Sequence, residues 1–472
     1  GVFSSWRRPR LHGPRPHCVV DMRRAVLKGS AACGATAAGV AYYQRLPRTY
    51  GDHRTEWSES VPSRFYRNWL APVIMKTDAE TAHVTTLAAA QVLQALWLLA
   101  EPSWTGSTPL DWLLRPAASA STPPGPSIRQ ELFGGRLCFE TPFGIAAGFD
   151  KNADLVPLYR LGTLPGLGFC EVGSVSALPS DGNPKPRCFR IVEDEVVVNR
   201  MGLNNIGSLA IAEKLKGFEV LGTATKPLPE APPRAPIGIN ITKTHSPLIM
   251  GDEAVEDFAT SFTRLVPYAD YMVLNISCPN TAEGKTFEDR ETLQGLLARI
   301  AEARGKVVSS SPPPPIFVKL SPPMDNEQGR AQLKELVEVA RASGTVDGFV
   351  VSNTAGDRDM PLSKEGREES DKIGRGGLSG RPLRARSTAS IKEVYRLTGG
   401  EMPIIGVGGV DSPEAAYEKI RAGASLVQVY TGLVYRGPFL FSDMHTGLRR
   451  LLERDGFKSV SEAVGVDVAL AR

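Results

Sequence analysis

The stretch Tyr271-Met-Val-Leu-Asn-Ile-Ser-Cys-Pro-Asn280 decides how this chain is organised. Its first half is rich in β-branched and aromatic residues, which is typical of a buried strand. Its second half turns polar and ends the strand at Pro279. Polar side chains at the end of a buried strand predict a sheet or barrel with chemistry at the strand's carboxyl end. An ordinary strand followed by an Asn/Pro turn is the alternative that this stretch alone leaves open.

The polar residues of this stretch favour a ring-shaped ligand. Asparagine both donates and accepts hydrogen bonds without carrying charge, so Asn275 and Asn280 suit a planar polar ring. The thiol of Cys278 lies between them in the sequence and is a candidate proton acceptor or nucleophile.

From about residue 137 onward, short apolar runs alternate with longer amphipathic stretches. Eight strands with helical connections predict a (β/α)8 TIM barrel, an α/β fold. The predicted strands cover residues 145–149, 169–175, 237–241, 271–277, 316–320, 348–352, 403–407 and 425–430. Residues 188–192 and 196–199 add a hairpin between the second and third strands.

A polar residue or a glycine stands where most of these strands stop. Because the carboxyl ends of parallel barrel strands share one rim, these residues are expected to lie together. They are Lys151, Ser174, Asn240, Asn275, Cys278, Lys319, Asn353, Gly408, Gly409, Tyr430 and Thr431.

The last two strand ends predict a phosphate site. Gly406-Val-Gly-Gly409 precedes Asp411-Ser-Pro413, a helix N-cap, and glycines there let backbone N–H groups approach a phosphate. Tyr430-Thr-Gly432 supplies further donors beside it. Lys319 stands inside the apolar strand Ile-Phe-Val-Lys-Leu, where a lysine needs an anionic partner. That partner is either a structural carboxylate or a cofactor ring that becomes anionic on reduction.

The N-terminal region differs from the rest in charge. Residues 1–60 hold ten Lys and Arg against four Asp and Glu, so a formal net charge of +4 leaves the remainder near −2. The body is therefore not expected to bind nucleic acid. An Arg-rich, acid-poor leader is typical of organelle targeting, and residues 29–44 are uncharged and rich in Ala and Gly. They are either a short membrane anchor or part of a transit peptide that is removed.

Residues 61–100 are expected to form two helices, the second starting at the capping box Thr77-Asp-Ala-Glu80. About 40 residues cannot enclose a core of their own. Their apolar face therefore lies either on the body or in a bilayer surface. The six cysteines contain no C-x-x-C pair, so neither a metal site nor a disulfide framework is expected.

These observations divide the chain into six parts. We expect a mitochondrial targeting leader at 1–28, a possible transmembrane anchor and linker at 29–60, a helical hairpin at 61–101, a Pro/Ser-rich insertion at 102–130, the catalytic barrel at 131–460 and a tail at 461–472.

Eight motifs occur in order along the chain. They are Ala147-Gly-Phe-Asp-Lys-Asn152, Glu171-Val-Gly-Ser-Val175, Gly182-Asn-Pro-Lys-Pro-Arg187, Asn199-Arg-Met-Gly-Leu-Asn204, Asn275-Ile-Ser-Cys-Pro-Asn280, Ser352-Asn-Thr354, Gly376-Gly-Leu-Ser-Gly380 and Gly406-Val-Gly-Gly409. With these motifs the chain closely resembles the dihydroorotate dehydrogenase family, over roughly residues 62–450. Its N-terminal region is similar to the mitochondrial, quinone-reducing class of that family.

The resemblance implies a site for FMN and dihydroorotate. FMN is expected on Ala147, Gly148, Ser174, Asn199, Asn240, Asn275, Lys319, Ser352, Gly380, Gly408, Gly409, Tyr430 and Thr431. Dihydroorotate is expected on Lys151, Asn199, Met201, Gly202, Leu203, Asn204, Asn275, Asn280, Asn353 and Thr354. The charges of these residues fit dihydroorotate, since a lysine can bind the substrate carboxylate while asparagines bind the amide edges of the ring.

The resemblance also implies the reaction. A general base removes the ring proton at C5 while a hydride passes from C6 to flavin N5, and ubiquinone reoxidises the flavin by a path past His83, Arg190 and Tyr430. Cys278 and Lys319 are the expected catalytic residues, in a monomer bound to lipid at the mitochondrial inner membrane. Cys278 departs from the serine usual in the membrane class, and a thiol, with an ordinary pKa of about 8.5, is the better base.

Two other functions compete with this one. The first is a soluble-type enzyme of the same family that uses fumarate or NAD as acceptor. The second is a non-catalytic, phosphate-binding barrel tethered to a membrane, which has no need of Asn275, Cys278, Asn280 and Asn353 together.

Overall fold

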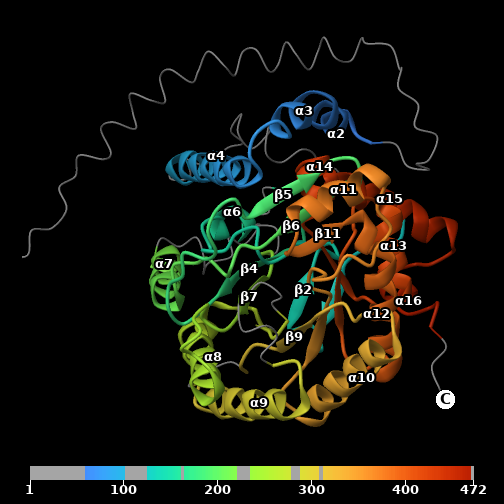
Figure 1. The fold of residues 1–472 in the computed structure, drawn as a ribbon. Coiled ribbons are helices and arrows are strands. Elements are labelled where there is room, and N and C mark those ends of the chain that lie inside the picture. Colours follow the sequence, from blue (N-terminus) through green and yellow to red (C-terminus); the bar gives the residue numbers. More distant parts are fainter. Residues whose placement is uncertain are drawn as a thin grey trace, which may run out of the picture. The chain divides into compact units, whose positions relative to one another are not determined.

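The computed structural model describes residues 59–100, 125–160, 164–220, 234–277, 287–307 and 312–468. Eight parallel strands form a closed barrel within these residues, which confirms the predicted TIM-barrel fold (Figure 1). They are β3 (Phe143–Ile145), β4 (Phe169–Val175), β7 (Ile237–Ile241), β8 (Tyr271–Asn275), β9 (Ile316–Leu320), β10 (Gly348–Val351), β12 (Ile404–Val407) and β13 (Leu426–Val429). The barrel closes where β13 pairs with β3, in the register Val429 to Ile145.

Helices surround the strands on the outside of the barrel (Figure 1). Most connect one strand to the next, as the alternating sequence pattern predicts. They are α6 (Val156–Arg160), α7 (Ser208–Val220), α8 (Gly251–Leu265), α9 (Arg290–Gly305), α10 (Glu327–Ala342), α11 (Lys364–Ile373), α12 (Arg384–Leu397), α13 (Pro413–Arg421), α14 (Thr431–Arg436), α15 (Leu440–Arg454) and α16 (Val460–Ala463), with the short 3₁₀ helices η3 (Val266–Tyr268) and η4 (Arg381–Leu383).

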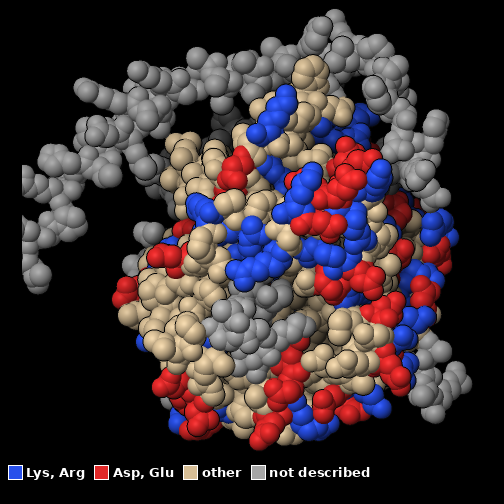
Figure 2. All heavy atoms as spheres, viewed as in Figure 1, with Lys and Arg blue, Asp and Glu red and all other residues tan. Residues whose placement is uncertain are grey.

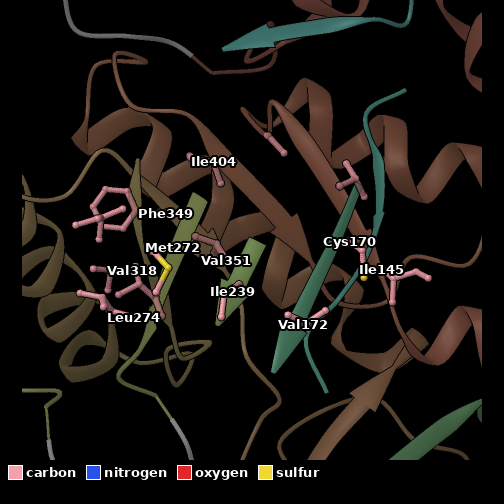
Figure 3. Packing of buried hydrophobic residues seen from close by; sticks show 14 of the residues in the cluster. Ile145, Cys170, Val172, Ile239, Met272, Leu274, Val318, Phe349, Val351 and Ile404 are labelled. Atoms are coloured by element: carbon pink, nitrogen blue, oxygen red, sulfur yellow. The ribbon is translucent and has the colours of Figure 1, made fainter. Parts of the chain in front are cut away.

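The strand residues are buried on both faces, and alternate residues enter different apolar clusters. In β8, Met272 and Leu274 pack outward with the helices, whereas Tyr271 and Val273 belong to a smaller cluster inside the barrel. Figure 3 shows part of the outer cluster. Inside, a Cβ on Gly238 would stand 2.1 Å from the ring of Tyr271, so glycine makes room for the aromatic ring there.

The first strand was predicted to start two residues and to end four residues too far along the chain. Its pairing with both neighbours ends at Ile145, and Gly148 has φ +98°, which an extended strand does not allow. The other predicted ends differ by two residues or fewer. A hairpin of β1 (Gln130–Leu132) and β2 (Leu137–Phe139) was not predicted, and it packs Phe139 edge-on against Phe169 at 5.4 Å between ring centroids.

The predicted hairpin at 188–199 is confirmed and has a third strand. β5 (Cys188–Ile191) pairs with β6 (Val196–Asn199), and β6 pairs on its other side with β11 (Gly377–Gly380). Residues almost 180 positions apart in the sequence thus form one small antiparallel sheet near the carboxyl ends of the barrel strands.

Two helical stretches precede the barrel. The first runs through α2 (Val61–Phe65), the π-helix η1 (Tyr66–Leu70) and α3 (Ala71–Ile74), and the second is α4 (Ala79–Ala100). The predicted capping box at Thr77 was wrong, because the Asp78 carboxylate accepts from the backbone N–H of Thr81 at 2.8 Å. Thr77 instead donates its hydroxyl to the Ile74 carbonyl at 2.7 Å.

Helix α4 is attached to the barrel at both of its ends. Gln94 donates to the Asp154 carbonyl and accepts from the backbone N–H of Leu158, each at 3.0 Å. Near the other end, the Glu80 carboxylate accepts a hydrogen bond at 2.7 Å from Arg187, the residue before β5. Within the described ranges, no helix combines the length and the apolar character that crossing a bilayer requires. The predicted leader and nearly all of the predicted anchor lie outside the described residues.

The predicted tail is in part integral to the fold. Val460 and Ala463 of α16 are fully buried, and Asp467 accepts from Arg421 at 2.5 Å. The described residues up to Val468 thus pack against α13. Figure 2 shows acidic and basic side chains interspersed on the face in view, with Lys and Arg gathered near its centre.

Candidate active site

A pocket opens at the carboxyl ends of the barrel strands, where the sequence predicts the site. The sheet of β5, β6 and β11 forms part of its wall. The predicted residues that line it are His83, Ala147, Gly148, Lys151, Ser174, Asn199, Met201, Gly202, Leu203, Asn275, Lys319, Ser352, Asn353, Thr354, Gly380, Gly408, Gly409, Tyr430 and Thr431. Cys278 and Asn280 lie outside the described residues, and Asn204, Asn240 and Arg190 are not on the pocket lining.

A chain of amide and hydroxyl groups crosses the pocket at the end of β8. The Asn353 amide donates to the Asn275 side-chain oxygen at 3.3 Å and to the Ser277 carbonyl at 2.8 Å. Asn275 in turn donates to the Ser174 hydroxyl at 2.9 Å. Three strand ends are thereby fixed to one another, and they present neutral donors and acceptors to the pocket.

Asn240 takes part in this network from behind the pocket surface. Its side-chain oxygen accepts from the Ser174 hydroxyl at 2.5 Å, and its amide donates to the Glu171 carboxylate at 2.8 Å. Asn240 is fully buried. It therefore orients Ser174, and any contact that it makes with a ligand depends on the ligand reaching this depth.

Lys319 has a carboxylate neighbour inside the barrel. Its Nζ lies 3.8 Å from Glu171 Oε1, and the two side chains are 7% and 0% exposed. The sequence left open whether this lysine meets a structural carboxylate or a ligand. The structure shows the carboxylate, and it also shows Lys319 on the pocket lining, so the ammonium faces both.

A tight turn after β3 presents Lys151. The buried Asp150 carboxylate accepts from the backbone N–H groups of Asp154 and Leu155, each at 2.8 Å. Burial raises the pKa of Asp150 to about 6. Lys151 donates to the Asn204 side-chain oxygen at 2.5 Å, so Asn204 positions the ammonium that lines the pocket.

Glycines and hydroxyl groups form the part of the pocket lining that follows β12 and β13. Gly408 and Gly409 have φ of +124° and +67°, and a Cβ on Gly409 would stand 2.5 Å from the Cβ of Arg384. The hydroxyls of Ser379 and Thr431 lie 2.8 Å apart beside them. Ser412, one residue later than the start of the predicted cap, accepts from the N–H of Ala415 and caps α13.

This end of the pocket fits a phosphate-bearing cofactor with a flat ring. The glycines bring backbone close to the pocket, where N–H groups bind phosphate oxygens without interference from side chains. The lining also has an apolar part, with Val197, Leu383, Val407 and Val410. An aromatic ring suits that surface, and Lys319 supplies a positive charge at its edge.

The side of the pocket toward α4 carries an aromatic series. The His83 ring packs edge-on against Phe149 at 5.1 Å, and Phe149 packs edge-on against Tyr430 at 6.1 Å. Burial and the nearby Lys151 ammonium lower the pKa of His83 to about 4, so its imidazole is neutral at physiological pH. Arg190 donates to the backbone carbonyls of Ile74 and Thr77, which ties β5 to the turn before α4.

Comparison with known proteins identifies the family. The dihydroorotate dehydrogenase family model matches residues 129–452. The chain belongs to the dihydroorotate dehydrogenase family. A relative from Natronomonas pharaonis named dihydroorotate dehydrogenase (quinone) is 38% identical over 399 residues, which are 84% of this chain and 98% of that relative. A mitochondrial one from Oryza sativa subsp. japonica is 35% identical over 472 residues, covering 95% and 97% of the two chains.

Solved structures of dihydroorotate dehydrogenase share the fold. A crystal structure of ligand-free DHODH from Eimeria tenella superposes with a TM-score of 0.65 at 32% sequence identity. It covers 80% of this chain and 98% of that chain. A second structure from the same organism, in complex with ferulenol, gives a TM-score of 0.64 at 31% identity.

Sequence reasoning missed several residues of this dihydroorotate dehydrogenase pocket. Gln428, a polar residue inside the apolar run of β13, lines the pocket and donates to Glu171 at 2.6 Å. The same kind of signal that singled out Lys319, a polar residue within a buried strand, was available for Gln428 and Glu171. Ser379, Glu80 and Cys188 also line the pocket. Pairing between distant strands brings Ser379 there, and the ion pair with Arg187 holds Glu80 of α4. Cys188 belongs to the predicted hairpin.

Proposed function

We propose that this protein oxidises (S)-dihydroorotate to orotate in pyrimidine biosynthesis, with FMN as its cofactor and ubiquinone as the electron acceptor. The observation that carries the proposal is one pocket whose lining gathers Asn275, Asn353 and Lys151 with Gly408 and Gly409, in a chain of the dihydroorotate dehydrogenase family. Members of that family are flavoenzymes. The two relatives that are named as quinone enzymes match this chain along nearly their whole length.

The cofactor's phosphate would be held by backbone groups of Gly408, Gly409 and Thr431, with Gly380 beside them. Its ring would lie toward Ala147, Gly148, Ser174, Asn275, Ser352 and Tyr430, near Lys319. When bound, flavin chemistry accepts a hydride from the substrate and passes two electrons to an acceptor. The protein's part is to orient the ring and to place the Lys319 ammonium where negative charge develops.

The substrate would be oriented by charge at one end and by amides at the other. Lys151, held by Asn204, is positioned to meet the substrate carboxylate. Asn275 and Asn353 are fixed by each other and by Ser277, so their free lone pairs and N–H groups point in set directions toward the ring amides. Asn199, Met201 to Leu203 and Thr354 complete this end of the pocket, with Asn280 proposed beside them.

Cys278 is the proposed general base. It directly follows Ser277, a residue fixed by its hydrogen bonds to Asn275 and Asn353 at the pocket end of β8. A thiolate in this position would take the C5 proton while the hydride leaves C6. A cysteine needs less help to ionise than the serine of the membrane class.

The quinone would approach from the side of α4. His83, Phe149 and Tyr430 provide an apolar series of rings there, and the neutral state of His83 avoids placing a charge beside an apolar ligand. Apolar side chains of the preceding helices are exposed, among them Trp69 (58%), Val73 (65%) and Val84 (56%). We propose that this surface contacts lipid and admits the quinone.

The N-terminal residues bear on where the enzyme acts in the cell. We propose a targeting leader in residues 1–28 and an anchor within 29–60, with the enzyme acting as a monomer at the mitochondrial inner membrane. The barrel, in our proposal, begins with β1 and extends through α16 and the residues that follow it.

An acceptor assay tests the proposal. Purified protein supplied with dihydroorotate should form orotate while it bleaches a dye coupled to ubiquinone. Neither fumarate nor NAD should replace the quinone, because the helices before the barrel provide the acceptor path. Equal rates with fumarate or NAD would favour the soluble-type reaction, and absence of orotate with every acceptor would leave only a ligand-binding barrel.

A further inference from the structure

The carboxylate of Glu171 lies in the barrel interior directly behind the pocket. Glu171 is the third residue of β4, and it is 0% exposed. It does not line the pocket, whereas two of its partners, Lys319 and Gln428, do. Nothing in the reaction described above requires an acid at this position, so a buried carboxylate there needs an explanation.

Three partners surround this carboxylate. Oε1 accepts from the Asn240 amide at 2.8 Å, Oε2 accepts from the Gln428 amide at 2.6 Å, and Lys319 Nζ stands 3.8 Å from Oε1. An ionised carboxylate accepts hydrogen bonds on both oxygens, which is what the two amides provide. Burying a charge is costly unless it is paired and hydrogen-bonded, and Glu171 is both.

The three partners each connect Glu171 to the cofactor end of the pocket. Lys319 and Gln428 present their other surfaces to the pocket, and Asn240 orients Ser174 through its side-chain oxygen. The Lys319 side chain therefore lies between the Glu171 carboxylate and the pocket. Any ligand that gains negative charge has to compete with Glu171 for this ammonium.

We propose that Glu171 is a positioning residue that holds Lys319 and lowers the reduction potential of the flavin bound in this pocket. The inference rests on the proposed function, because it needs a flavin. Lys319 alone would favour the reduced, anionic ring strongly, and the Glu171 charge offsets part of that effect. Electrons taken from dihydroorotate then leave readily to the quinone.

The test is the reduction potential of the flavin in the full-length holoenzyme with Glu171→Gln. Removing one buried unit charge from the neighbourhood of a charge-forming group changes its equilibrium by about tenfold. At a fixed potential, the ratio of reduced to oxidised flavin should therefore rise about tenfold, a shift of about +30 mV for two electrons. The substitution is sterically mild, and Gln428 Oε1, buried without a hydrogen-bond partner among the described residues, can accept from the new amide.

Tyr271→Phe is the matched control. It removes the buried Tyr271 hydroxyl from the same barrel interior, where that hydroxyl neighbours the side chains of Glu171 and Gln428. The charge is unchanged, so the potential should equal that of the wild type. A shift in Tyr271→Phe as large as that in Glu171→Gln would assign the effect to altered packing and overturn the proposal.

A flavin-loaded Glu171→Gln protein with the wild-type potential would also overturn it. If that variant does not fold, Lys319→Gln is compared with the double variant Glu171→Gln/Lys319→Gln, in which no charge is left unpaired. The double variant should have the higher potential, and equal potentials would reject a role for Glu171. Failure of the proposed function is distinct, since the wild-type protein would then hold no flavin or hold one that dihydroorotate does not reduce.

Discussion

The strands of the barrel and the helices that precede it bury their apolar residues differently. In β8 every residue is buried, and Leu274 is 0% exposed. In α4, by contrast, Val84 and Val92 are 56% and 55% exposed, although the helix is attached to the barrel through Gln94 and Glu80. The barrel's apolar residues serve its stability, whereas those of the preceding helices remain available for contact with something else.

The largest expected difference is in stability. Leu274→Ala leaves a cavity in the packed outer cluster and should lower the free energy of unfolding by about 2–5 kcal/mol. Val84→Ala, on the exposed side of α4, should change it by less than about 0.5 kcal/mol. Urea unfolding of both variants measures the contrast. Equal losses would mean that Val84 is buried in the folded protein.

The next effect concerns proton transfer at the end of β8. Cys278→Ala should slow reduction of the flavin by dihydroorotate by about 10²-fold or more, because the C5 proton loses its acceptor. Reoxidation by quinone, which needs no such base, should keep its rate. Anaerobic stopped-flow absorbance measures the two half-reactions separately. An unchanged rate of flavin reduction would remove Cys278 from the role of base.

His83 makes stability depend on pH at the junction of the two regions. Its pKa in the folded protein is about 4, below the ordinary 6.5, so at mildly acidic pH the unfolded chain takes up a proton that the folded one does not. The stabilisation is fully present above about pH 6.5 and is lost as the pH falls from there toward 4. Over that window the contribution of His83 to the unfolding equilibrium changes by about tenfold per pH unit.

His83→Gln should remove this part of the pH dependence. Urea unfolding of the wild type and the variant at neutral pH and near pH 5 measures it. An identical loss of stability in both proteins on acidification would show that His83 is already protonated in the folded state.

The smallest of these effects concerns the exposed apolar helices. Trp69→Ser with Val73→Ser should raise the apparent KM for ubiquinone presented in liposomes by about tenfold, since roughly two large side chains no longer enter the lipid. Leu248→Ser is the matched control, because Leu248 is 82% exposed but lies in the loop after β7. Equal effects of the two changes on KM would argue against a lipid-facing role for α2 to α4.

The buried strands of the barrel were predictable from the sequence, whereas pairing between distant segments was not. Strands buried on both faces carry continuous apolar runs, so all eight were found. Most of the described residues that were expected at their ends line one pocket. Pairing between distant segments leaves no local signal. The third strand of the small sheet, Gly377–Gly380, was therefore missed, as was Ser379 on the pocket wall.

Competition between neighbouring polar groups was equally hard to predict. Thr77 and Asp78 can both cap a helix, and the choice of Asp78 depends on Thr77 reaching the Ile74 carbonyl. For Lys319 the sequence predicted a buried anion as partner, but Glu171 is 148 positions away and becomes its neighbour only when β4 and β9 close into the barrel.

One measurement tests the account most directly, the absorbance spectrum of the purified protein titrated anaerobically with dihydroorotate. We expect the visible absorbance bands of a bound flavin, which should bleach with one equivalent of dihydroorotate and return when ubiquinone is added. A protein without flavin bands, or one whose bands persist in excess dihydroorotate, would contradict it.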